Sequence, residues 1–141
     1  MLFRSETLRG LAGGTITPTP QDSSQATLAP PLKKEDGRIN WSLPAQKIYN
    51  RIRGFQPWPG AFTTFRGKQC AIWGGPAPTT ATQAGPETPG TIRTIGGEVD
   101  VACGEETALL LEFVQLEDRK RIAAREFANG ARLAPGERFG S

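Results

Sequence analysis

The sequence predicts a mainly β domain: a small five-stranded barrel with one helix before it and one short helix after it. Five short runs with strand character follow one another within about 55 residues, separated by turn-forming residues. The 17 Gly and 12 Pro residues also favour turns and short strands over a helical bundle. A length of 141 residues with 37% apolar residues allows one domain with a modest core and a tail.

The predicted strands lie between residues 61 and 116. The first two flank Arg66-Gly67-Lys68, which is typical of a hairpin turn. Residues 74–89 are rich in Gly, Pro, Thr and Ala with almost no charge, and we expect a loop there. The five strand runs are AFTTF (61–65), QCAIW (69–73), GTIRTI (90–95), EVDVACG (98–104) and TALLLEFVQL (107–116).

Helices are predicted on both sides of the strands. In residues 43–54, apolar side chains recur at helical spacing, Ser42 is expected to cap the first turn, and Gly54 ends the helix. The segment FQPWPG that follows contains two prolines and is expected to be a rigid corner around Trp58. REFANG (125–130) predicts a final helix of about two turns.

The N-terminal part is predicted to be a short helix followed by an extended linker. Residues 3–13 place Phe3, Leu8 and Leu11 on one side, and Gly13-Gly14 stops the helix. Eleven residues are too few for a stable isolated helix, so this helix is expected to need a neighbour. Residues 14–40 alternate Thr, Pro, Ser and Gln, which favours extended geometry.

Several classes of function are excluded by residue types that the chain lacks. It contains no His, so the commonest general base and the commonest zinc ligand are missing, and it has no GxSxG or Walker motif. Cys70 and Cys103 form no CxxC pair and are expected to be reduced, partly buried thiols, with a disulfide as the minority alternative. No signal peptide or membrane span is recognisable, so a cytoplasmic protein is predicted.

Charge is distributed unevenly along the chain. Residues 33–73 carry eight Lys or Arg and two acids, residues 74–116 carry one Arg and six acids, and residues 117–141 carry six Lys or Arg and four acids. This polarity indicates a polyanionic partner, whose phosphates exposed cations would neutralise. The candidate binding residues are Lys33, Lys34, Arg38, Lys47, Arg51, Arg66, Lys68, Arg119, Lys120 and Arg121.

Aromatic residues offer a second way to bind nucleic acid. Trp41, Trp58 and Trp73 can be considered as base-stacking platforms, but each is flanked by apolar residues or prolines. Packing in the core or in corners is therefore favoured for all three, and also for Phe127 and Phe139.

Two long runs resemble a known family. TPTPQDSSQATLAPPLKKEDGRINWSLPAQKIYNRIRGFQPWPGAF (17–62) resembles the linker and first helix of the C-terminal half of methionyl-tRNA formyltransferase. RKRIAAREFANGARLAPGERFG (119–140) resembles the closing motif of that family, and residues 90–118 match the strands between them. Ala123 stands where the family usually has a Ser that caps the last helix.

The resemblance implies an OB-like Greek-key barrel that binds tRNA. It divides the chain into the end of a catalytic domain (1–14), an extended basic linker (15–40) and an OB-like domain (41–141). In the family, a Rossmann-like N-terminal domain carries the active-site Asn, His and Asp and binds 10-formyltetrahydrofolate, so no catalytic, cofactor-binding or metal-binding residue is expected here. The implied partners are initiator tRNA, through its phosphates, and a Rossmann-type catalytic domain, with no membrane and no metal.

Two other functions remain open. A formyltransferase active by itself would need the folate-binding domain and the catalytic His, so this chain alone is predicted to be inactive. A repurposed or vestigial OB-like module that binds a protein is favoured by the uncharged segment 74–89 and by a second strand that is less basic than in the family.

Overall fold

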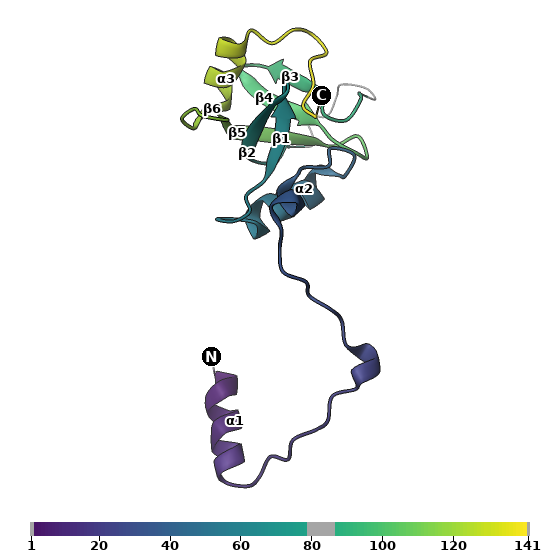
Figure 1. Ribbon diagram of the computed structural model, residues 1–141, viewed down its shortest axis with the longest axis vertical. Helices are drawn as coiled ribbons and strands as arrows, with labels where there is room; N and C mark the ends of the chain where they lie inside the picture. Colours follow the sequence, from purple (N-terminus) through teal and green to yellow (C-terminus); the bar gives the residue numbers. More distant parts are fainter. Residues whose placement is uncertain (1, 79–86, 141) are drawn as a thin grey trace. The chain divides into compact units, whose positions relative to one another are not determined.

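The computed structural model describes residues 2–78 and 87–140, with side chains from residue 5 onward. Two compact units are present, Met1–Pro31 and Leu32–Ser141, and Figure 1 shows both. The N-terminal unit contains helix α1 (Leu2–Ala12) and a 3₁₀ turn η1 (Ser23–Gln25). The predicted first helix is confirmed, and Leu8 and Leu11 on it are exposed.

The second unit is built on one antiparallel sheet. Its strands run in the order β1-β2-β5-β4-β3, and β6 pairs with the outer part of β5. Three helical elements accompany the sheet. In chain order, the helical elements and strands of this unit are η2 (Lys34–Gly37), α2 (Ala45–Gly54), β1 (Phe62–Phe65), β2 (Lys68–Pro76), β3 (Ile92–Ile95), β4 (Glu98–Ala102), β5 (Ala108–Leu116), β6 (Ile122–Ala123) and α3 (Ala124–Ala131).

The prediction of a mainly β domain is confirmed, with three differences in detail. The described part of the sheet has six strands, because residues 122–123 form β6, and it does not close into a barrel. Residues 74–76, predicted to be loop, continue β2 alongside β5. The rest of the predicted loop falls largely on residues 79–86, which lie outside the described residues.

The C-terminal segment occupies the gap between the two end strands of the sheet. The Phe139 N–H donates to the Gly90 carbonyl, and the Gly140 N–H donates to the Thr64 carbonyl on β1 (both 2.9 Å). On the other side, the Ile92 N–H of β3 donates to the Glu137 carbonyl (2.8 Å). The tail therefore pairs with backbone groups at both edges of the open sheet, and these groups would otherwise be unpaired.

Aromatic rings fill the interior where this tail enters. Phe139 is buried and lies between Trp41, Phe65 and Phe127, with ring-centre distances of 5.7, 5.7 and 6.1 Å. The Trp41 indole N–H donates to the Thr63 hydroxyl (3.1 Å), so its polar edge is satisfied inside the core. The packing prediction is confirmed for Trp41, Phe127 and Phe139.

Helix α2 begins differently from the prediction. Pro44, not Ser42, is the residue before the first turn, and no side chain of that residue caps the helix. The Ala45 N–H instead donates to the hydroxyl of Thr107, 62 residues away (2.8 Å). A tertiary contact thus supplies the acceptor that a local cap normally provides. Gly54 ends the helix as predicted, and Ile48 and Ile52 are buried.

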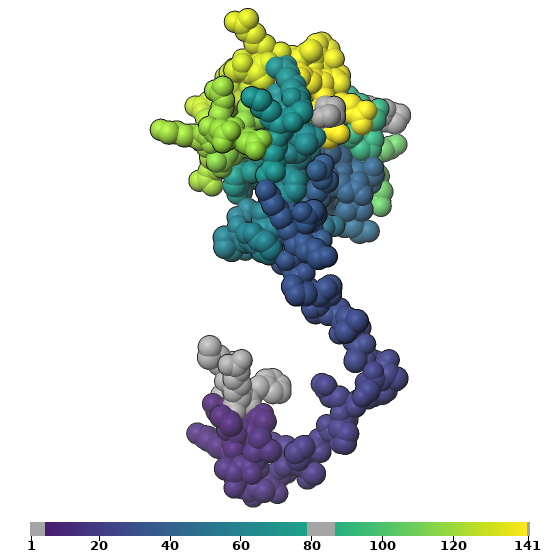
Figure 2. Space-filling view, in the orientation of Figure 1, coloured from purple at the N-terminus to yellow at the C-terminus, as the bar shows by residue number. Residues whose placement is uncertain are grey.

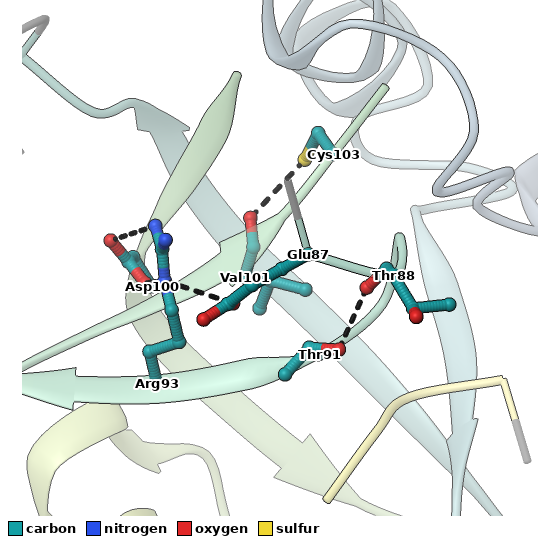
Figure 3. A network of polar contacts seen from close by, with 7 residues as sticks. All are labelled: Glu87, Thr88, Thr91, Arg93, Asp100, Val101 and Cys103. Carbon is teal, nitrogen blue, oxygen red and sulfur yellow. Dashed lines mark hydrogen bonds and ion pairs between the residues drawn. The ribbon is translucent and has the colours of Figure 1, made fainter. Parts of the chain in front are cut away.

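A nearly buried ion pair holds the β3–β4 hairpin together. Arg93 on β3 faces Asp100 on β4, and its guanidinium donates to both carboxylate oxygens at 2.7 and 2.8 Å. Glu87 lies 3.7 Å from the same guanidinium (Figure 3). Asp100 is only 5% exposed, so the bidentate geometry compensates the cost of removing its charge from water.

Candidate nucleic-acid interface

All ten candidate cations are exposed, and the fold brings most of them into two groups. We call Lys33, Lys34, Arg38, Lys47 and Arg51 the helix-side cluster, because they lie on η2, at its two ends and on α2. The hairpin-side cluster consists of Arg66, Lys68, Arg119 and Lys120. The remaining candidate, Arg121, lies over the rings of Trp73 and Phe113.

The helix-side cluster forms where η2 packs against α2. The Arg51 guanidinium donates to the Asp36 carbonyl (2.8 Å), which fixes this basic turn beside the helix. Arg38 and Arg51 line the same small pocket, and each also lies over an aromatic ring, Phe62 and Phe55 respectively. Lys47 precedes Arg51 by one helical turn and shares its face. Residues 32–40, which the sequence places in the linker, therefore contribute to the folded unit.

The hairpin-side cluster surrounds a groove of about 390 Å³. Its lining includes Arg66 and Lys68 from the β1–β2 turn and Arg119 from the β5–β6 turn. Figure 2 shows these two turns side by side, in teal and light green. Arg119 and Lys120 also line a neighbouring apolar hollow, and two acids, Glu117 and Glu126, line the groove together with the cations. Segments about 50 residues apart thus present cations on one side of the molecule.

One member of this cluster is already neutralised. Arg66 donates two hydrogen bonds to Glu137, the second of them at 2.9 Å. The Arg66 hydrogen bond lowers the pKa of the Glu137 carboxyl, and the same bond raises the pKa of the Arg66 guanidinium. The pair joins the hairpin tip to the C-terminal segment, so Arg66 is a weaker candidate for a phosphate than Lys68 or Arg119. No sequence pattern indicates this partner, which lies 71 positions away.

The tryptophans are not all packed as predicted. Trp58 is 58% exposed, so the packing prediction is wrong for it. The corner folds back through a hydrogen bond from the Gly60 N–H to the Phe55 carbonyl (2.9 Å), which leaves the ring outside. Trp73 is half-buried on the outer face of β2, with the Arg121 guanidinium 5.3 Å from its ring centre.

No metal-binding group of three or more His, Cys, Asp or Glu is present in the described part of the chain. Cys70 and Cys103 are both buried and unbridged, which confirms the prediction of free thiols. Burial raises the pKa of each thiol to about 12, so neither is a reactive nucleophile near neutral pH. The helices among the described residues are too short or too polar to cross a lipid bilayer.

The sequence of this domain matches a known protein family. Residues 31–132 match the model of the formyl transferase C-terminal domain. The chain belongs to this family. The match begins where the folded unit begins and ends just after α3, so the family domain contains both turns of the hairpin-side cluster and all of the helix-side cluster.

Relatives of this C-terminal domain are methionyl-tRNA formyltransferases. That of Solibacter usitatus is 57% identical over 136 residues, that of Koribacter versatilis is 47% identical over 135, and that of Bacillus velezensis is 40% identical over 136. Each alignment covers 96% of this chain and 42% of the relative. The chain therefore spans less than half the length of the relatives that it matches.

Solved structures share the fold at lower identity. HypX from Aquifex aeolicus in complex with tetrahydrofolic acid gives a TM-score of 0.57 at 17% identity, covering 94% of this chain and 23% of HypX. A variant of HypX from Aquifex aeolicus with six substitutions gives the same TM-score at 17% identity, covering 89% of this chain and 22% of HypX. These likenesses concern the fold alone.

Proposed function

We propose that this chain is the tRNA-holding part of a methionyl-tRNA formyltransferase and works in the cytoplasm. The observation that carries the proposal is the grouping of exposed cations from four separate segments into two clusters on a domain of this family. Phosphate contacts of this kind position a folded RNA without reading its bases.

The proposal assigns the chemical step to another domain. Formyl transfer from 10-formyltetrahydrofolate to the methionine of initiator tRNA would take place on the part of the relatives that this chain does not match. Helix α1 supports such an arrangement, because Leu8 and Leu11 are exposed and a helix of 11 residues gains its stability from packing. A Rossmann-type catalytic domain would cover them.

Salt dependence tests the tRNA-binding role. If about five phosphates are neutralised, the logarithm of the association constant for initiator tRNA should fall with log salt at a slope of roughly −4. Fluorescence anisotropy at several salt concentrations measures this slope, and elongator tRNA in parallel measures discrimination. An affinity that does not change with salt, or binding to a protein but to no tRNA, would contradict the proposal and favour a protein-interaction module.

Two double variants that remove the same charge test which surface binds the tRNA. The double variant Lys68→Gln/Arg119→Gln removes two cations of the hairpin-side groove and should flatten the slope by about 2. The control Arg53→Gln/Arg125→Gln removes the same charge from exposed residues outside both clusters. It should change the slope by less than 1. Equal effects of the two double variants would show that net charge alone, and not this surface, holds the tRNA.

A further inference from the structure

An aromatic pair on the outer face of the sheet is left open by the fold. Trp73 on β2 and Phe113 on β5 stand directly opposite each other in the register of the two strands. The residues beside them, Ile72 and Val114, are fully buried, so Trp73 and Phe113 point to the other face. Phe113 is 40% exposed, which is unusual for a large aromatic side chain in the middle of a nine-residue strand.

Two local features leave Phe113 exposed. The register between β2 and β5 shifts immediately after Trp73, and such a bulge increases the local twist and changes the direction of a side chain. On the other side of Phe113, its partner on β6 is Ala123, whose methyl group is too small to cover the ring. Phe113 therefore remains accessible beside the half-buried Trp73.

Arg121 completes the surface. Its guanidinium carbon lies 5.3 Å from the centre of the Trp73 ring and 5.0 Å from that of Phe113, within the range of cation–π attraction. Two other arginines are bound to acids, Arg66 to Glu137 and Arg93 to Asp100. In the described residues, no carboxylate lies within ion-pair distance of Arg121. Its donors are therefore free for a ligand while its plane is held by two rings.

From this geometry we infer that Trp73, Phe113 and Arg121 form a stacking platform for an unpaired nucleotide of RNA. Aromatic rings and arginine planes stack on bases, and the free guanidinium N–H groups bind an adjacent phosphate. The inference rests on the proposed tRNA-holding function and adds a second kind of contact to it. The two clusters would hold the helical backbone, and the platform would hold a base that is not in a helix.

Base stacking and charge attraction at this surface can be distinguished by substitution. An acidic protein segment would be attracted by the charge of Arg121, whether arginine or lysine supplied it. A base needs the planar guanidinium and the rings beneath it, because stacking requires a flat surface. The variant Arg121→Lys keeps the charge and loses the plane, and Phe113→Leu keeps an apolar side chain and loses the ring.

The test compares two RNA probes with the full chain. One is a blunt RNA duplex, and the other is the same duplex with a four-nucleotide 3′ overhang of adenine and cytosine. The wild-type chain should bind the overhang probe about fivefold more tightly or better, since each stacked base contributes strongly to affinity. Phe113→Leu should bring this ratio close to one and leave binding of the blunt duplex unchanged. Arg121→Lys should also bring the ratio close to one. Arg125→Gln removes an exposed cation that has no aromatic ring beneath it among the described residues, and it should preserve the ratio.

Each result has a distinct meaning. A ratio near one for the wild-type chain, or a ratio that Arg121→Lys and Phe113→Leu leave intact, overturns the platform. Salt-dependent binding of the blunt duplex would still support the tRNA-holding function in that case. Both variants replace exposed side chains, and a thermal unfolding curve recorded by circular dichroism confirms that each remains folded.

Discussion

Replacing Phe139 by alanine tests whether the C-terminal tail is part of the core. Phe139 is 2% exposed and contacts three other rings, although it is only one residue from the end of the described chain. Burying a phenylalanine removes roughly 150–250 Å² from water, which corresponds to about 4–6 kcal/mol at 25 cal/mol per Å². Alanine retains a small part of that area, so we expect a loss of about 4 kcal/mol, within the range known for Phe→Ala substitutions in cores.

Urea unfolding followed by tryptophan fluorescence measures this loss. Trp41 stacks on Phe139 at 5.7 Å, so its emission reports on the site directly. Domains of this size are stable by about 5–15 kcal/mol, and a loss of about 4 kcal/mol would move the midpoint far to lower urea. The control is Phe113→Ala, a change of the same type at an exposed position, which should cost less than about 1.5 kcal/mol. A loss below about 1 kcal/mol for Phe139→Ala would refute the conclusion that the tail completes the core.

Three further predictions concern charges and thiols. Arg93→Met should destabilise the domain by about 3 kcal/mol or more in urea unfolding, because it leaves the buried Asp100 carboxylate unpaired, and adding Asp100→Leu should recover most of the loss. Glu137→Gln should lower the melting temperature at pH 7. The hydrogen bond from Arg66 lowers the pKa of Glu137 below its ordinary 4.5, so the ion pair stabilises the folded state above pH 4.5. The difference in melting temperature from wild type should therefore shrink as the pH falls below 4.5. A difference that does not depend on pH would exclude this ion pair as the cause. The two cysteines, whose pKa burial raises from 9.0 to about 12, should react with a thiol reagent at pH 8 roughly a thousand times more slowly in the folded chain than in urea, and fast labelling of the folded chain would contradict their burial.

The exposed cations of the candidate site could be predicted from the sequence, but their grouping in space could not. The exposure of the ten candidate cations could be predicted from the sequence, because Lys and Arg side chains are mostly exposed. The grouping of Lys68 with Arg119 depends on β2 pairing with β5, which places their turns at the same end of the sheet. The pairing of Arg66 with Glu137 depends on the path of the tail, and it changes which cations are free.

The sequence by itself determined the type and position of nearly every element in the described chain, since alternating apolar residues, Gly-rich turns and a helical stripe act over a few neighbouring residues. Only the tertiary structure decided how the sheet ends are covered, that a two-residue strand forms beside Phe113, and that the start of α2 is capped by Thr107. These features join residues distant along the chain, and their energy comes from burial and hydrogen bonds that exist only once the strands have found their register. The platform at Trp73 is of the same kind, because strand pairing and not local sequence sets its rings side by side.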